Sequence, residues 1–542
     1  MPKPVQSSPL ANKYFLIVDD FQGVRNILTN ILRTCGADGT KIETAANGSE
    51  ALAWLKRQVF DVVLCDFNLG PGKNGQNVLE EAKEQKLIGP ACTWIIVTAD
   101  KTSHTVAGHA EHRPDAYMLK PITEAMVRQR LDRVWAKKEA FGVIELAARE
   151  NNFDKAMALC DEAMTTHRAN IADLMRAKAE YAMTSGQPDV ALQVYDRMLI
   201  LRDVPWAKTG IARIHIQQGR LDDARRILEQ TIQDWPAFME AHDLLAQFQI
   251  NAADLDAALI SLERAARISP NSVFRQSKLG DVALKLGKPD RAEKAFRKCI
   301  DLGENSIFQS PQPYLGLARA CSANTNAGEA LKALAQALKV FDDEDIRVKA
   351  RAIEGIVHHA GGNMEMSKTI AGEFVQRLDS GPIAALLDGQ ASLDLARLLF
   401  HTDHADIAIQ LLKSQVSQRP EDLAMQEEVK KIFEQQNMAD EGKQLVEESR
   451  KEGNERMNRG VLLARDGKYE EAIEAMREAK QTMAHNGRVL FNLAHVIITR
   501  LQQVGNDTAL ANEAHATLLM ANKLTPGLPR YAQLMASLQP FL

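Results

Sequence analysis

A spacing of 34 residues recurs through most of the chain after about residue 170. Two series of small residues keep this interval: Ala212, Ala246 and Gly280 in the first, and Ala224, Ala258 and Ala292 in the second. Because antiparallel helices cross closely only where small side chains meet, the two series mark facing helices within one repeat. Large residues four positions later fill the space to the next repeat: Tyr195, Leu228, Leu262, Phe296 and Leu334. The pattern predicts stacked helix pairs.

This segment resembles a tetratricopeptide repeat (TPR) array, whose unit is a 34-residue helix pair. The clearest copy is GVLLARDGKYEEAIEAMREA at 460–479. The resemblance implies an all-α TPR solenoid over residues 139–542, with room for about ten helix pairs and a weaker pattern at 345–450. Residues 501–513 resemble an insertion, and a generic helical bundle is the alternative. Such arrays stack into a superhelix whose concave face binds proteins, so the resemblance implies an unknown protein partner.

The first quarter of the chain has a different pattern, in which apolar strand signals alternate with amphipathic helices. We expect strands at 14–18, 41–45, 62–66, 93–100 and 116–121, with helices between them and a last helix from Thr123 to about Ala140. This alternation predicts an α/β doubly wound, five-stranded parallel sheet. In such folds ligands bind at the carboxyl ends of the strands.

Polar residues stand where four of these strands end. They are Asp19 and Asp20, Asp66, Thr98, and Lys120 before Pro121. Carboxylate oxygens suit a hard cation such as Mg²⁺, and a carboxylate can also act as a nucleophile towards phosphorus. Phosphoryl transfer then mainly needs positioning and charge neutralisation, which a metal, an amine and a hydroxyl supply.

This set resembles the receiver domain of bacterial two-component response regulators, of the chemotaxis type, over residues 12–138, with 1–11 as a disordered N-terminus. The resemblance implies that Asp66 is the phosphoacceptor. It also implies that Asp19, Asp20, Asp66 and the backbone carbonyl of Asn68 hold Mg²⁺. By the same resemblance, further residues contact the phosphoryl group or switch with it: Thr98, Ala99, Tyr117 and Lys120, the last before a cis peptide at Pro121.

The loop after Asp66 carries two ambiguities. Gly70, Gly72 and Gly75 fit G-x-G-x-x-G, which can cradle a dinucleotide. That fingerprint belongs to the first strand–helix unit, and an acid here would repel a pyrophosphate, so we favour the phosphoacceptor interpretation. The loop also departs from the receiver pattern, because Lys73-Asn74-Gly75 replaces the usual acid-glycine pair.

Composition excludes several other classes of function. The net charge of −5 and the lack of a clustered basic patch argue against nucleic-acid binding. Six scattered cysteines without a C-x-x-C pair, no signal peptide and no run of 18 apolar residues predict a cytoplasmic protein that does not span a membrane. His401 and His404, without a carboxylate cluster, are expected in a solvated turn, and His104, His109 and His112 on the receiver surface.

These observations predict a phosphorelay response regulator. We expect a sensor histidine kinase or phosphotransfer protein to phosphorylate Asp66, and the receiver to control protein binding by the TPR array. The only catalysis expected is the receiver's own phosphoryl transfer and dephosphorylation. The alternative is a scaffold with a phosphorylation-independent pseudo-receiver, and either domain could mediate a homodimer. No Pro/Gly-rich linker follows Pro121, so a rigid helical junction between the two parts is expected.

Overall fold

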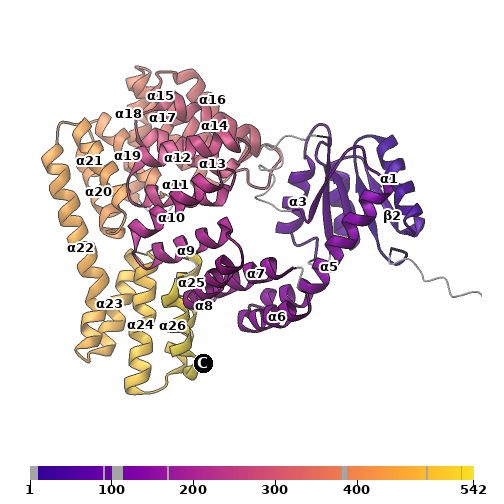
Figure 1. The fold of residues 1–542 in the computed structure, drawn as a ribbon. Helices are drawn as coiled ribbons and strands as arrows, with labels where there is room; N and C mark the ends of the chain where they lie inside the picture. The colour runs from indigo at the N-terminus through magenta and orange to yellow at the C-terminus, as the bar shows by residue number, and fades with distance from the viewer. Residues whose placement is uncertain are drawn as a thin grey trace, which may run out of the picture.

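The computed structural model describes residues 10–89, 92–99, 114–167, 170–380, 387–483, 486–525 and 528–542. An α/β domain from the first part of the chain lies beside a long array of helices (Figure 1). His104, His109, His112 and most of the N-terminal segment, on which predictions were made, lie outside the described residues. Among the described residues, no helix has the length and apolarity needed to cross a bilayer.

The α/β domain contains five parallel strands, as predicted, and the structure shows their order to be β2-β1-β3-β4-β5. The strands are β1 (Phe15–Val18), β2 (Ile42–Ala45), β3 (Val62–Asp66), β4 (Thr93–Thr98) and β5 (Ala116–Leu119). The described helices between and after them are α1 (Gln22–Thr34), α2 (Gly48–Arg57), α3 (Gly75–Glu84) and α5 (Glu124–Arg149). The residue after Val18 therefore lies at the same sheet edge as Asp66, because Val18 pairs with Cys65.

Alternation along the strands divides the core into two layers. Leu16 and Val63 join the cluster that α2 and α3 cover, whereas Ile17 and Leu64 join the cluster under α1 and α5. Successive strand residues point to opposite faces, so a continuous apolar run is what a strand covered on both faces requires. The buried strands hold their carboxyl ends in fixed positions.

The remainder of the chain folds into consecutive antiparallel helix pairs (Figure 1). The helices are α6 (Phe153–Thr166), α7 (Ile171–Thr184), α8 (Pro188–Leu201), α9 (Pro205–Gln217), α10 (Leu221–Asp234), α11 (Met239–Asn251), α12 (Leu255–Ile268), α13 (Val273–Lys285), α14 (Pro289–Gly303), α15 (Gln312–Ala323), α16 (Ala327–Val340), α17 (Glu344–Ala360), α18 (Met364–Ser380), α19 (Gly389–His401), α20 (Ala405–Gln418), α21 (Leu423–Gln435), α22 (Ala439–Arg465), α23 (Tyr469–Thr482), α24 (Gly487–Val504), α25 (Thr508–Leu524) and α26 (Pro529–Leu538).

The small residues predicted from the 34-residue interval lie where the helices cross. Ala212, Ala224 and Ala258 are fully buried. A methyl group added at Gly280 would come within 2.6 Å of the Phe296 ring, so the aromatic side chain occupies the space that the glycine leaves. Large and small positions therefore interlock, as the repeat pattern requires.

Three features of the array differ from simple repetition. Helix α22 is 27 residues long and packs against helices on both sides of it in the chain, α21 and α23. The array also bends back on itself, because the Lys431 amine in α21 donates to the Lys285 carbonyl oxygen at the end of α13, at 2.9 Å. The segment 501–513, predicted as an insertion, is partly helical, since α24 continues to Val504 before a short turn and α25.

A single helix joins the two parts of the chain. Helix α5 runs through residue 138, the predicted end of the receiver, and continues to Arg149; it also packs against α6. Trp135 packs against the core cluster under α1 and α5. The junction is thus a continuous helix with no loop inside it, and a continuous helix transmits a rotation or shift better than a flexible linker.

Candidate phosphoacceptor site

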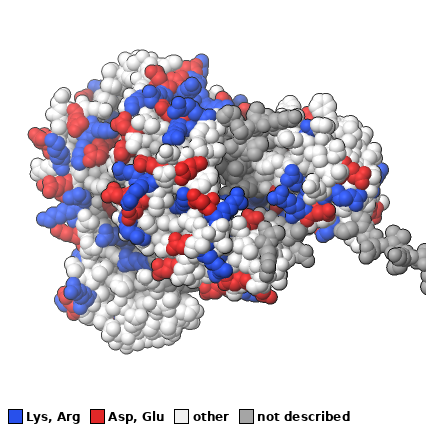
Figure 2. All heavy atoms as spheres, viewed as in Figure 1, with Lys and Arg blue, Asp and Glu red and all other residues white. Residues whose placement is uncertain are grey.

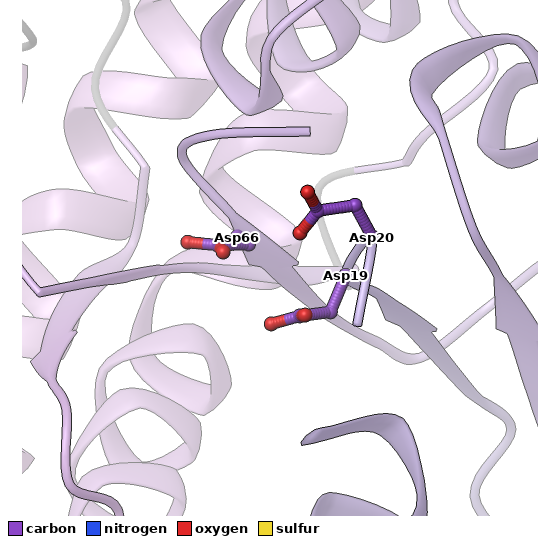
Figure 3. A group of neighbouring side chains, drawn as sticks. All are labelled: Asp19, Asp20 and Asp66. Atoms are coloured by element: carbon purple, nitrogen blue, oxygen red, sulfur yellow. The ribbon is translucent and has the colours of Figure 1, made fainter. Parts of the chain in front are cut away.

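Strand ends bring three acidic side chains to one edge of the sheet. Asp19 and Asp20 follow β1 directly, and Asp66 is the last residue of β3. One carboxylate oxygen from each of the three lies within 4.8 Å of the others. Figure 3 shows the three carboxylates grouped at the tips of these neighbouring strands. Oxygen donors this close can share one hard cation.

Lys120, which directly follows the fifth strand, completes the cluster. Its amine donates to Asp66 Oδ2 at 2.8 Å and to Asp19 Oδ2 at 2.9 Å. The Lys120–Pro121 peptide bond is cis, as the resemblance implied. Asp19 is fully buried and Asp66 is 8% exposed, so the ammonium group balances two carboxylates that have little water around them.

The charges shift one another's protonation. Burial raises the pKa of the Asp66 carboxyl above its ordinary value, and the hydrogen bond and positive charge of Lys120 offset part of this effect. Burial lowers the pKa of the Lys120 amine, but its hydrogen bonds to Asp66 and Asp19 outweigh burial and raise the pKa overall. The amine therefore stays charged, and the carboxylate beside it is a comparatively basic oxygen nucleophile.

Asp19 is oriented by residues that sequence reasoning missed. Its Oδ1 accepts the backbone N–H of Phe21 at 3.0 Å, and the buried Arg25 guanidinium donates to its backbone carbonyl. Arg25 lies on α1, where spacing alone indicates an ordinary polar helix position. Only its burial reveals that it supports the acidic turn.

The remaining predicted residues surround this cluster with different degrees of burial. Thr98 ends β4 and is 3% exposed, whereas Ala99 after it and Asn68 after Asp66 are exposed. Tyr117 in β5 is half-buried, and burial raises the pKa of its phenol. The Thr98 hydroxyl, at the end of β4 beside β3, thus lies at the same sheet edge as Asp66.

The glycine-rich loop has a steric explanation. Gly70 and Gly72 adopt positive φ angles of 73° and 99°, which favour glycine. A Cβ atom at Gly75 would lie 2.1 Å from the Asp66 carbonyl oxygen. The three glycines of the G-x-G-x-x-G pattern therefore allow the chain to turn tightly and pass close to the backbone of Asp66. In place of an acid, Lys73 pairs with Glu81, and Asn74 caps α3 through a reciprocal capping box with Asn77.

Comparison with protein families agrees with both halves of this architecture. The response regulator receiver domain family matches residues 15–132. Tetratricopeptide repeat families match residues 182–248, 216–280 and 277–305. The chemotaxis protein CheY-3 of Vibrio cholerae is 31% identical over 126 residues, which are 23% of this chain and 94% of that protein. The chain belongs to the response regulator receiver family. It is a response regulator of the CheY-like type with TPR repeats after the receiver.

Other relatives of this response regulator match the same region. The chemotaxis protein CheY of Pseudomonas aeruginosa is 28% identical over 122 residues, 22% of this chain and 95% of that protein. Among solved structures, CheY4 of Vibrio cholerae is 24% identical and covers 22% of this chain and 98% of its own, with a TM-score of 0.21. A CheY-like receiver from Methanospirillum hungatei is 26% identical and covers 23% of this chain and 96% of its own, also at 0.21.

The TPR half of the response regulator presents paired charges. Within the array, Asp394 accepts from Arg319 at 2.8 Å and from Arg397 at 3.3 Å, and Arg397 reaches Glu428 at 3.1 Å. Figure 2 shows acidic and basic residues interspersed over the upper and middle parts of the visible face of the array, whereas the lowest part of this face is mostly uncharged.

The histidines of the array form a contact that spacing did not predict. The rings of His359 in α17 and His401 in α19 stack with centroids 4.2 Å apart. Burial, together with the neighbouring His359, lowers the pKa of His401. Among the described residues, one group of three or more His, Cys, Asp or Glu side chains is spaced closely enough to hold a metal ion. It consists of the three aspartates at the sheet edge.

Proposed function

We propose that Asp66 accepts a phosphoryl group from a histidine kinase or phosphotransfer protein and that this event controls protein binding by the TPR array. The observation that carries the proposal is the Lys120 amine, which reaches both Asp66 and Asp19 within 2.9 Å beside the exposed Asp20. This arrangement provides a nucleophilic oxygen, a cation next to it and a set of oxygen ligands at one point.

In the proposed transfer, an Asp66 carboxylate oxygen forms a bond to phosphorus while the bond from phosphorus to the donor's histidine nitrogen breaks. The nitrogen leaves with the electron pair and is protonated on the donor. Lys120 stays protonated throughout and balances charge on the phosphoryl oxygens, consistent with its raised pKa. The carboxylate must be ionised to attack, so activity should fall in acid as Asp66 takes up a proton.

Receiver domains bind Mg²⁺ in an acidic pocket, and the residues here fit that ion. Asp19, Asp20 and Asp66 supply hard oxygen donors, and Asn68 stands two residues after Asp66 in the following loop, where its carbonyl is proposed as a further ligand. A bound Mg²⁺ would neutralise negative charge near the phosphoryl group. Asp20, as the exposed member, is the carboxylate that solvent and an incoming ion reach first.

The output requires a change that reaches the array. Phosphorylation adds about 1.5 to 2 negative charges and three acceptor oxygens at Asp66. Thr98, at the end of the adjacent strand, is proposed to turn its hydroxyl towards these oxygens, with Tyr117 following it inward. Both strands precede α5, and α5 is continuous with the array, so a shift of β5 and α5 reaches the first helix pairs directly.

The test is phosphoryl uptake by the full-length protein with acetyl phosphate and Mg²⁺. Wild type should acquire a label that is lost on Asp66→Asn. Asp132→Asn, the same change at an exposed position of α5, should label like wild type. Labelling of the Asp66→Asn form at the wild-type level would refute the assignment. Failure of wild type to take up label or bind beryllofluoride would favour the pseudo-receiver scaffold instead.

A further inference from the structure

Helix α3 buries an acidic side chain on the side that faces away from the sheet. Val78, Leu79 and Ala82 belong to the core cluster under this helix. Successive helical residues turn by about 100°, so Glu80 lies about 150° from the middle of that apolar face. Glu80 is nevertheless only 9% exposed, while Glu84, one turn further on the same side, is exposed. The N-terminal half of α3 is therefore covered on its side away from the sheet.

Among the described residues, the connection between α14 and α15 in the array contributes to this cover. Ser306, itself 8% exposed, places its hydroxyl 3.2 Å from Glu80 Oε2, across 226 residues of sequence. The same hydroxyl oxygen accepts the backbone N–H of Phe308 at 3.2 Å. The Ser306 backbone N–H in turn donates to the Gly303 carbonyl at 2.9 Å. The turn thus presents the serine hydroxyl, which donates to the carboxylate of the receiver.

This connection is longer than the repeat requires. The small residues Ala246 and Gly280 are 34 positions apart, but Gly280 and Ala318 are 38 apart. The connection spans residues 304–311, whereas the corresponding connections before and after it are 269–272 and 341–343. The four extra residues lie in the part of the array that touches the receiver. Phe308 from this loop also meets Phe274 of α13, with ring centroids 5.1 Å apart, which supports the loop from behind.

Helix α3 is tied closely to the phosphoacceptor strand. It begins at Gly75, whose N–H donates to the Phe67 carbonyl at 2.9 Å and whose Cα packs against the Asp66 backbone. Residues 67–74 form the whole connection between β3 and α3. A displacement of the Asp66 backbone therefore moves the first turn of the helix that carries Glu80.

We propose that residues 304–311 form a dock for α3 of the chain's own receiver, with the Glu80–Ser306 hydrogen bond at its centre. The receiver is then attached to the array twice, through α5 at the first helix pair and through the dock at α14–α15. Coupling of the dock to the phosphorylation state of Asp66 is the part of this proposal that rests on the proposed function.

Cross-linking in the full-length protein tests the dock. All six native cysteines are buried, so an introduced pair is the accessible target. A short methylene-bridged bis-methanethiosulfonate should link Glu80→Cys to Ser306→Cys within one chain at least tenfold faster than it links Glu84→Cys to Ser306→Cys. Equal rates for the two pairs, or no intramolecular product, would overturn the dock.

A second measurement avoids substituting the receiver. Hydrogen exchange of α3 amides should be at least threefold faster in Ser306→Ala than in wild type. The matched change Ser310→Ala in the same loop should leave exchange unaltered. Unchanged exchange in Ser306→Ala would count against the hydrogen bond as the centre of the dock.

The coupling is tested by repeating the cross-linking with beryllofluoride and Mg²⁺. The Glu80→Cys/Ser306→Cys rate should change at least threefold, and the change should vanish when Asp66→Asn is added. If the protein takes up the phosphoryl label but its cross-linking rate is the same with and without beryllofluoride, the coupling is refuted. Absence of label together with efficient cross-linking would refute the proposed function and leave the dock intact, so the two failures are distinguishable.

Discussion

Replacing Lys120 by methionine removes the cation that contacts both Asp19 and Asp66 and keeps a side chain of similar length. At 2.8 Å and an effective dielectric constant of about 20, each ion pair is worth roughly 6 kcal/mol before desolvation is subtracted. Removing one partner of a buried pair typically costs about 3–5 kcal/mol. The Lys120 side chain is 25% exposed, so we expect about 3 kcal/mol at pH 7.

The loss should depend on pH in a defined direction. Burial already raises the pKa of Asp66, and without the ammonium group the pKa rises further. A carboxyl whose pKa is higher in the folded than in the unfolded state favours folding most below its unfolded pKa, and this contribution is lost as pH rises through the folded pKa. The deficit of Lys120→Met should therefore be smaller at pH 5 than at pH 7.

The loss of stability around Asp66 in Lys120→Met can be measured by hydrogen exchange of the β3 amides in the full-length protein. A loss of about 3 kcal/mol corresponds to exchange about a hundredfold faster at pH 7. Lys56→Met on the exposed side of α2 is the matched control and should exchange like wild type. Lys120→Met exchange within about threefold of wild type at pH 7, or a deficit that grows towards pH 5, would refute the electrostatic reasoning.

Three further changes probe the loop, the array and the metal. Gly75→Ala forces a Cβ atom to 2.1 Å from the Asp66 carbonyl, so phosphoryl uptake from acetyl phosphate should fall at least tenfold; wild-type uptake would contradict the close approach. Gly280→Val pushes against the Phe296 ring and should destabilise the array by about 1–3 kcal/mol in urea unfolding, while Gly328→Ala, with open space around it, should not. Mg²⁺ affinity, followed by a fluorescence titration, should weaken as pH falls through the raised pKa of Asp66, and a pH-independent affinity from pH 5 to 7.5 would exclude that carboxylate as a ligand.

The receiver pocket was accessible to sequence reasoning because its residues occupy strand ends. In a parallel sheet, the ends of adjacent strands share one edge, so the order of strands converts distant positions into neighbours. Asp19, Asp66 and Lys120 could be placed together on that basis, and their hydrogen bonds are as close as the placement requires. Arg25 could not be found this way, because its role depends on burial behind Asp19.

The helix pairs were equally accessible, since every repeat must solve the same packing problem and leaves the same residues at the same interval. The irregular parts of the array could not be predicted from the sequence. The fusion of two helices into α22 depends on packing against neighbours on both sides, and sequence spacing does not record it.

Local patterning thus determined the elements, the repeat interval and the residues of the acidic pocket, because strand and helix periodicities act over a few residues. Tertiary structure alone decided which distant surfaces meet. The contact of Ser306 with Glu80, and the return of α21 to α13, join residues far apart in the chain. Each such contact occurs once, so it leaves no repeating pattern in the sequence. The partners meet because the stacked helices bend as the array extends.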